Sequence, residues 1–459
     1  MEDHIALQHQ IEEAIGKLVR RKKLQSNGAT DRFPLRVEVP VRRCQPLAWL
    51  NCQKPFPRIY WRDRKKELEI AAVGAVQQHS GESISDFRET TRPIEELLNR
   101  APETMRFYGG LRFDVRLPAD ETWQRFGSFL FVLPRFELIS GEGEPRLAYN
   151  FIYRTSDDPE IPLKEFRREW TSLIWEEKQP EEQPNNRLNE AEVPERPDWE
   201  AAVSRALQLM RRSSPEKVVL ARKKLFRAPL PFSPLWFLQR LHHNTANAFL
   251  FLFQLDAETA FLGATPERLF RKSHDMIESD ALASTRPRGA TPDEDLRLEQ
   301  ELLTSTKELT EHRWVSHMIE TTLKPLCEHL DIPLRETVLK LATVQHIYTL
   351  FRGELKDGVG VGELLQGLHP TPAVAGIPRQ AAMQVIAELE GFDRGWYAGP
   401  VGWISRYSAE FAVAIRSALI SGNILTLFAG AGIVEGSVPA QEWQETESKF
   451  LNFTRLLRG

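Results

Sequence analysis

The sequence predicts a mixed α+β (α/β) fold with a large hydrophobic core. The chain has 459 residues, 41% of them hydrophobic, which is typical of a water-soluble protein of this size. Some stretches repeat apolar residues at helical spacing, whereas others are short runs of the β-branched and aromatic residues that favour strands. Length alone suggests two or three domains, although one large α/β unit is also compatible with it.

Composition excludes several classes of protein. Sixty Lys and Arg against 64 Asp and Glu give a net charge of −4, so we expect a small-molecule partner and no nucleic acid. Cys44, Cys52 and Cys327 are too few and too scattered for a disulfide framework or a cysteine zinc site. The N-terminus lacks the pattern of a secretory signal, and no apolar run approaches the length of a membrane span. We therefore expect a soluble, cytoplasmic protein without stable membrane insertion.

The N-terminal part begins with a predicted helix and continues with strands. Residues 5–25 place apolar side chains at helical spacing and end in the basic run Arg20–Lys23, which we interpret as a solvated helix end. Short β-rich runs follow as far as Tyr153. The expected strands are Leu35–Pro40, Arg58–Trp61, Leu68–Val73, Phe107–Phe113, Phe129–Leu138 and Arg146–Tyr153.

Residues 176–196 separate this part from the rest of the chain. The segment is rich in Glu, Gln, Pro and Asn, with little to bury, and predicts a mobile surface loop. After it, Asp198 is expected to cap a helix whose apolar stripe begins at Trp199. Further along we expect strand 217–226, helix 234–243, hairpin 248–262, a mostly helical stretch 291–329, extended residues 337–355, and helices 362–368 and 379–390.

A glycine-rich stretch near the C-terminus, residues 428–445, predicts a strand that runs into a helix. Gly430 and Gly432 have no Cβ, so a loop at this place can turn backbone N–H groups toward an anion. Glu442 and Glu445 lie three residues apart and share a face if the chain is helical from Pro439. An ordinary strand-to-helix turn with solvated acids explains these residues equally well.

The preceding stretch, Phe411–Arg416, alternates like a strand with two different faces. One face is bulky and apolar, whereas the other is small and carries Glu410 and Arg416 at its ends. A guanidinium grips a carboxylate through two hydrogen bonds, so the small face suits the floor of a pocket for a carboxylate ligand. A turn at Gly422 and Asn423 joins this strand to the glycine-rich one.

Several motifs, together and in order, resemble those of the chorismate-utilising enzymes, the family of isochorismate, salicylate, anthranilate and aminodeoxychorismate synthases. The motifs of the C-terminal part are Lys217–Arg222 (KVVLAR), Phe261–Leu269 (FLGATPERL), Lys307–His312 (KELTEH), Val344–His346 (VQH), His369–Val374 (HPTPAV), Trp396–Gly399 (WYAG), Gly430–Ile433 (GAGI) and Glu442–Thr446 (EWQET). Those of the N-terminal part, Pro46–Leu50, Pro57–Trp61 and Arg106–Gly110, resemble the quinone-type isochorismate synthases.

The resemblance covers nearly the whole chain except the first thirty residues and the loop 176–196. It implies one large domain of two packed, mainly antiparallel sheets with helices outside, which replaces the expectation of two or three domains. Residues 1–30 are then a helical extension and 31–459 the family domain. Within that domain, 31–175 is the family-specific N-terminal part and 197–459 the catalytic core.

The resemblance also implies the chemistry. In isochorismate formation, water adds at C2 of the chorismate ring while the C4 hydroxyl leaves and the double bonds shift. Lys217 matches the family's base and Glu267 its acid, which requires a neutral lysine and a protonated glutamic acid. Taken alone, these residues would be a solvated lysine at a strand end and an exposed acid in a turn.

The same resemblance implies a metal site and substrate contacts. Glu311 and Glu445 match the family's Mg²⁺ ligands, and Glu442 and Glu308 are close enough to help through water, which suits an ion that prefers oxygen. Otherwise Glu308 and Glu311 are a solvated helix face. The expected substrate-binding residues are Gly430, Ala431, Gly432 and Ile433 through N–H groups, Arg416, Tyr397, His346, Ala373, Ser284 and Thr285. His346 on its own would be an ordinary hydrogen-bonded core histidine.

Three positions separate the branches of the family. Lys217 favours water as the nucleophile, because the ammonia-using branch carries glutamine there, and no glutaminase subunit is then expected. Ala283 stands where the aminodeoxychorismate branch has a nucleophilic lysine. Ala373 stands where salicylate synthases usually have threonine, which favours a reaction that stops at isochorismate. A salicylate synthase and a non-catalytic chorismate-binding protein are the alternatives, and a monomer is expected.

One departure from the family pattern concerns the substrate site. The usual sequence EALAGT appears here as DALAST at residues 280–285, so Ser284 replaces a glycine that lets the backbone approach the substrate. We expect slower turnover or altered substrate affinity rather than loss of activity.

Overall fold

The computed structural model describes residues 2–25, 32–42, 45–176, 178–180, 188–212, 215–340 and 344–458. Its helices are α1 (Glu2–Gln25), α2 (Pro46–Cys52), α3 (Phe87–Leu98), α4 (Ile161–Trp170), α5 (Arg196–Arg212), α6 (Pro234–Asn244), α7 (Pro292–Thr304), α8 (Thr306–Leu323), α9 (Val361–Leu368), α10 (Arg379–Leu389) and α11 (Pro439–Arg458). Its strands are β1 (Arg32–Pro40), β2 (Arg58–Arg62), β3 (Leu68–Gly81), β4 (Arg106–Leu111), β5 (Phe129–Gly141), β6 (Arg146–Arg154), β7 (Asn189–Val193), β8 (Lys217–Arg227), β9 (Phe249–Gln254), β10 (Thr259–Thr265), β11 (Arg268–Ser273), β12 (Met276–Pro287), β13 (Cys327–Lys340), β14 (Val344–Leu355), β15 (Gly376–Ile377), β16 (Pro400–Ser405), β17 (Ser408–Val413), β18 (Ser417–Ser421) and β19 (Ile424–Val434).

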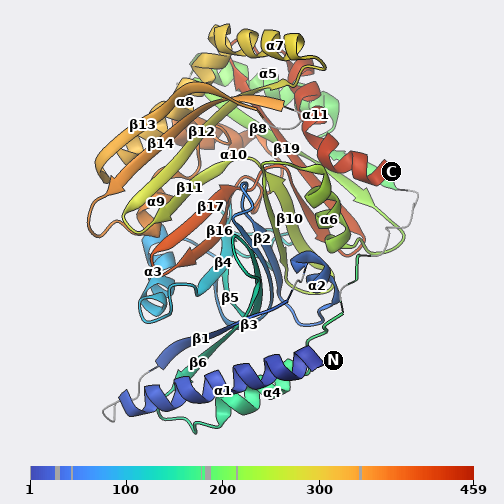
Figure 1. Ribbon diagram of the computed structural model, residues 1–459. Helices are drawn as coiled ribbons and strands as arrows, with labels where there is room; N and C mark the ends of the chain where they lie inside the picture. The colour runs from blue at the N-terminus through green and yellow to red at the C-terminus, as the bar shows by residue number, and fades with distance from the viewer. Residues whose placement is uncertain are drawn as a thin grey trace.

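The strands form two arms of one antiparallel network. One arm follows the order β8, β19, β18, β10, β9, β2, β3 and β5. The other follows β4, β16, β17, β11, β12, β14 and β13. Strand β5 pairs with both β3 and β4, and so joins the arms (Figure 1). The predicted single α+β domain is confirmed, with its two packed sheets continuous through β5.

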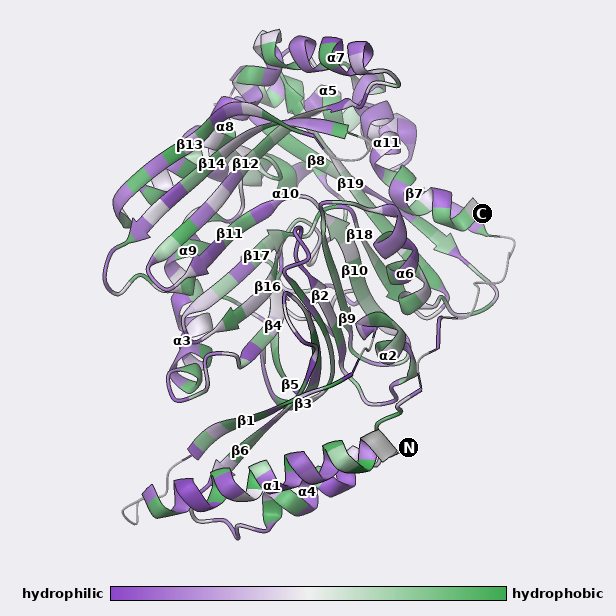
Figure 2. Ribbon diagram, viewed as in Figure 1, coloured by the Kyte–Doolittle hydropathy of each residue, from purple (hydrophilic) through white to green (hydrophobic). Residues whose placement is uncertain are grey.

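Two hydrophobic cores hold the layers together. The larger core lies between the two arms, where aromatic side chains such as Phe251, Phe261 and Phe411 are fully buried. The second core lies on the outer face of the first arm under α1, α2, α4, α6 and α11. Hydrophilic and hydrophobic residues alternate along α1, which buries only one stripe against β1 (Figure 2). Among the described helices, none combines the length and the apolar character needed to cross a bilayer.

Most predicted elements are confirmed, including the first helix, the hairpin of β9 and β10, and the helix from Pro439. Three predictions are wrong in part. The helical stretch ends at Leu323, and Cys327–Lys340 is a strand. Helix α5 begins at Arg196, so Asp198 lies in its first turn rather than at the cap. Strand β17 ends at Val413, before Arg416.

The predicted loop 176–196 is also partly wrong, because β7 occupies its C-terminal portion; residues 177 and 181–187 lie outside the described residues. Strand β7 pairs with β8 along its length. Its Glu190 and Glu192 bind Lys224 at 3.2 and 2.7 Å. Backbone pairing and ion pairs therefore order a segment whose lack of apolar residues predicted a loop.

Candidate functional site

Lys217 begins β8 and lies inside the protein, beside Glu311 of α8. Only 4% of Lys217 is exposed, and its Nζ lies 3.5 Å from Glu311 Oε2. A Cβ added to Gly432 would lie 2.8 Å from Lys217 Cε. The glycine therefore leaves the space that the lysine side chain occupies. The structure thus brings the predicted base and a predicted metal ligand into contact.

The glycine-rich stretch is an extended strand rather than the expected loop. Gly430 and Gly432 lie opposite Ala221 and Val219 of β8. The N–H groups of Ala221 and Val219 point away from β19, to the Glu390 carboxylate and to Ala375 O. In an antiparallel ladder, both residues of such a pair direct their N–H and C=O groups away from each other.

It follows that only alternate N–H groups of this stretch are directed away from β8. The N–H groups of Gly430 and Gly432 are directed away from β8. On the same side, the Gly430 carbonyl oxygen accepts a hydrogen bond from Lys449 Nζ at 2.7 Å. Those of Ala431 and Ile433 face β8, so the prediction that all four N–H groups bind substrate is wrong for these two. Strand β18 pairs with β19 only as far as Leu427, which leaves this edge to α11.

Glu267 lies between β10 and β11 and is 4% exposed. Burial raises the pKa of Glu267 from its usual 4.5 to about 7, although the nearby charge of Lys217 opposes the change. Thr371 Oγ1 donates a hydrogen bond to Glu267 Oε1 at 3.5 Å, which also acts to lower the pKa of Glu267. A large fraction of Glu267 is therefore protonated at neutral pH, as a general acid must be.

The predicted metal ligands come from α8 and α11. Burial raises the pKa of Glu442, and the negative charges of Glu445 and Glu311 raise it further. Glu445 binds Lys449 at 2.6 Å. Burial acts to raise the pKa of Glu445, but Lys449 together with the nearby charges of Lys217 and Arg416 outweighs it and leaves this pKa below its usual value. Glu308 instead pairs with Arg286 at 2.7 Å.

Arg416 reaches the same region from outside the strand on which it was predicted. It follows β17 with a backbone φ of 52°, and its carbonyl oxygen accepts a hydrogen bond from Ala264 N at 3.1 Å. Burial lowers the pKa of the Arg416 guanidinium, while Tyr397 and Glu445 act in the opposite direction. The ring of Tyr397 stacks on Phe428 at 5.2 Å, and its hydroxyl would lie 3.3 Å from a Cβ on Gly430.

The remaining predicted residues lie on other elements. His346 is buried on β14, opposite Thr285 of β12. Ser284 is the extra residue of a β-bulge between Ala283 and Thr285, and the side chains of Ser284 and Thr285 lie outside the described residues. Ala373 packs against the larger core, between the two arms. Substrate contacts of these residues stay predictions.

Sequence reasoning missed several residues that support the site. Lys449 follows Glu445 by four positions, a helical spacing that points to an ion pair. Thr371 belongs to the HPTPAV motif, but nothing local signals its contact with Glu267. Arg394 donates to Val374 O at 2.8 Å and to Val219 O at 2.7 Å, which ties the loop after Thr371 to β8. No sequence pattern indicates that link.

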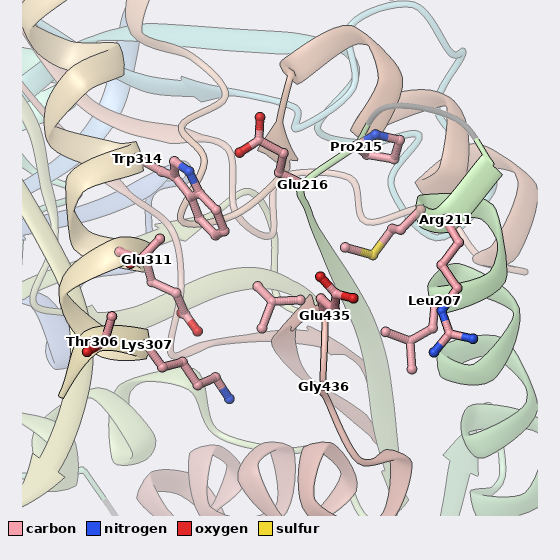
Figure 3. Close-up of a pocket in the computed structure, with 13 residues that line it drawn as sticks. Leu207, Arg211, Pro215, Glu216, Thr306, Lys307, Glu311, Trp314, Glu435 and Gly436 are labelled. Carbon is pink, nitrogen blue, oxygen red and sulfur yellow. The ribbon is translucent and has the colours of Figure 1, made fainter.

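A pocket of about 540 Å³ opens next to Lys217 and Glu311. Figure 3 shows Lys307 and Glu311 on one side, Leu207 and Arg211 on the other, and Glu435 between them. Val434, which is paired with Lys217 across the ladder, also lines the pocket. The pocket therefore adjoins the buried lysine and one of the predicted metal ligands.

Known proteins resemble this chain over most of its length. Residues 21–458 match the family described as chorismate binding enzyme. Isochorismate synthase 2, chloroplastic, of Arabidopsis thaliana is 34% identical, covering 92% of this chain and 80% of the relative. Isochorismate synthase MenF of Bacillus subtilis is 32% identical, covering 91% and 92%. The structure of MenF, the menaquinone-specific isochorismate synthase from Escherichia coli, superposes with a TM-score of 0.82 at 28% identity, covering 97% and 99%. This chain therefore belongs to the chorismate-binding enzyme family.

Proposed function

We propose that this protein is an isochorismate synthase that converts chorismate to isochorismate. The observation that carries the proposal is the buried Glu267, whose pKa is raised to about 7 near a buried lysine, because the reaction needs an acid and a base at one ring. Relatives that carry this activity in their names resemble the chain almost end to end. Water as nucleophile requires no glutaminase subunit, and the protein is proposed to act as a monomer.

The reaction divides between two side chains. Lys217 Nζ takes a proton from water, whose oxygen forms a bond to C2 of the ring. Both ring double bonds shift, the bond from C4 to its hydroxyl breaks, and Glu267 donates its proton so that the hydroxyl leaves as water. One water enters and one leaves, and the proton on Lys217 returns to Glu267 through solvent. Each positioned proton transfer typically contributes about 10²- to 10⁴-fold in rate.

The acids of α8 and α11 fit a divalent metal ion. Burial is the main cause of the raised pKa of Glu442, the nearby carboxylates of Glu445 and Glu311 add to it, and carboxylate oxygens are the ligands that Mg²⁺ prefers. Among the described residues, no three acidic, histidine or cysteine side chains stand close enough to form a ready ligand cluster. Glu311 and Glu445 would hold the ion after leaving Lys217 and Lys449, with Glu442 contributing through water.

When bound, Mg²⁺ would neutralise a carboxylate of the substrate beside these acids. Glu308 is the weakest candidate ligand, because Arg286 already engages its carboxylate. The substrate's carboxylates would be bound by Arg416 and by the N–H groups of Gly430 and Gly432. Tyr397 and His346 would line the ring pocket, together with Ala373, Ser284 and Thr285.

The test is to incubate the purified protein with chorismate and MgCl₂ and to identify the products by chromatography. Isochorismate, formed with MgCl₂ and abolished by EDTA, is the expected result. Salicylate with pyruvate would identify the salicylate synthase alternative. Recovery of unchanged chorismate from a protein that binds it would identify a non-catalytic chorismate-binding protein.

The pocket beside Glu311 gives a prediction about substrate access. Chorismate is a dianion, and the exposed Arg211 lies on the wall of the pocket. Arg211→Ala is expected to raise KM about two- to fivefold and to leave kcat unchanged, because one exposed charge contributes little. The effect should shrink in high salt, because salt screens the attraction.

The matched control is Arg212→Ala, which removes the neighbouring exposed arginine that does not line the pocket. Steady-state kinetics at low and high salt compare the two variants. Equal changes in KM would show that only the overall charge of the surface matters.

A further inference from the structure

Arg222 is a completely buried arginine that connects β8 to α11. Its exposed fraction is 0%, and its Nε donates to Thr446 Oγ1 at 2.7 Å. The guanidinium lies 3.5 Å from the centre of the Trp443 ring and also binds the Glu447 carboxylate. A planar cation that stacks on an indole and donates in its own plane fixes both the distance and the rotation of the helix.

Arg222 also lies 3.5 Å from Glu192 of β7, and its partners on α11 occupy one face of that helix, next to the face that carries the acids. They recur at the spacing i, i+3, i+4 and i+7, which is one side of a helix. Glu442 and Glu445 each precede a partner by one residue and are therefore turned about 100° from this side. A rotation of α11 that broke the contacts with Arg222 would move both carboxylates. The partners are Trp443, Thr446, Glu447 and Phe450.

The same strand also carries Lys217. The ladder between β8 and β19 is regular from Lys217 to Arg227, so the backbone positions of Lys217 and Arg222 are fixed relative to each other. Lys217 contacts Glu311 of α8 at 3.5 Å. Strand β8 therefore links α8, through Lys217, with α11, through Arg222.

We propose that Arg222 is a positioning residue, which sets the rotation of α11 so that Glu445 and Glu442 face Glu311 and Lys217. The inference rests on the proposed magnesium site but concerns a residue that contacts neither metal nor substrate. Removing such an outer support of a metal ligand typically weakens binding of the metal by about 10- to 100-fold.

The experiment compares Arg222→Met with the wild-type protein by titration calorimetry of MgCl₂ in the absence of chorismate. We expect Arg222→Met to bind Mg²⁺ about 10- to 100-fold more weakly. At saturating MgCl₂ its kcat should return to within a few-fold of wild type, since Arg222 takes no part in proton transfer. Thermal unfolding of both proteins in EDTA shows whether the variant is folded.

Lys224→Met is the matched control. Lys224 lies on the same strand and binds Glu447 at 2.9 Å, as well as Glu190 and Glu192 of β7. It is not a partner of Thr446 or of the Trp443 ring, so its loss removes ion pairs without freeing the rotation of α11. We expect Lys224→Met to unfold at a lower temperature than wild type and to bind Mg²⁺ with wild-type affinity.

If Arg222→Met does not fold, Thr446→Val serves in its place. This change removes the buried acceptor of the Arg222 Nε, together with the hydrogen bond that the same hydroxyl donates to Trp443 O within the helix, and keeps the volume of the side chain. We expect several-fold weaker Mg²⁺ binding. Wild-type affinity in a folded Arg222→Met, or in Thr446→Val where Arg222→Met does not fold, would overturn the inference, as would an equal loss in Lys224→Met. A wild-type protein that binds no Mg²⁺ would instead contradict the proposed metal site.

Discussion

Lys217→Ala is expected to lower kcat by about 10²- to 10⁴-fold, because the variant has no base to take the proton from water. The loss should come from chemistry alone. Lys217 contacts the Glu311 carboxylate and offers no oxygen atom to the metal ion. Its removal frees Glu311 and should leave the affinity for Mg²⁺ unchanged or higher. Product formation in single-turnover experiments and calorimetric Mg²⁺ titration measure the two effects separately.

Two further variants separate a base from a simple positive charge. Lys217→Arg keeps the charge beside Glu311, but a guanidinium cannot give up its proton at any usable pH. It should therefore be as inactive as Lys217→Ala. Lys223→Ala, on the same strand with its amine 5.0 Å from the centre of the Phe392 ring, should keep wild-type kcat. Substantial activity in Lys217→Arg would show that Lys217 acts through its charge.

Glu267→Gln is expected to reduce kcat by a similar factor of about 10²–10⁴, because an amide cannot donate a proton to the leaving hydroxyl. In the wild-type enzyme, the acid is active only when protonated. The pKa of about 7 therefore predicts that kcat/KM falls as pH rises through about 7. Pre-steady-state and steady-state rates between pH 5 and 9 measure both effects.

Thr371→Val tests the assignment of this pH limb. Burial is the main cause of the raised pKa of Glu267, and the Thr371 hydroxyl lowers that pKa by donating to the carboxylate. Removing the hydroxyl should shift the alkaline limb of kcat/KM to higher pH. A limb that stays in place, or that persists in the residual activity of Glu267→Gln, would assign it to another group.

The same raised pKa predicts that Glu267→Gln, which loses activity, is more stable against unfolding than the wild-type protein at alkaline pH. The folded protein holds the Glu267 proton up to about pH 7, whereas the unfolded chain releases it near 4.5. The contribution of Glu267 to the free energy of unfolding is therefore full below about pH 4.5 and is lost as the pH rises through about 7, by about 3 kcal/mol for a group that is buried. Glu267→Gln does not ionise, so at pH 8 it should unfold at a higher temperature than wild type.

Local patterns in the sequence predicted many elements and the identity of the central side chains. Alternation and turn residues predicted the hairpin of β9 and β10, and helical spacing predicted α1 and the helix that carries Glu442 and Glu445. These signals are local because they depend only on the period of the backbone. The role of Lys217, in contrast, came from the resemblance of whole motifs, because a single lysine at a strand end carries no such information.

Some local patterns gave the wrong structure. Bulky apolar residues continue to alternate with small or charged ones past Val413, so the strand was expected to include Arg416. The strand instead ends at Val413, and the chain turns at Arg416 with a positive φ. The glycines near Lys217 suggested a loop that binds anions, although they belong to a strand and partly serve to leave space for the lysine. Both errors arise because glycine residues, and an alternation of apolar and polar residues, are compatible with more than one backbone conformation. Pairing with neighbouring strands decides which conformation forms.

The amino-acid sequence is enough to identify the side chains that are available for acid–base chemistry and metal binding: Lys217, Glu267 and the acids of two helices. The surroundings of these side chains depend on how the chain folds. The register of β8 against β19 directs the N–H groups of Gly430 and Gly432 away from the ladder, burial raises the pKa of Glu267, and Arg222 reaches α11. Burial and register depend on strands and helices that are distant in the chain, and no local spacing encodes them.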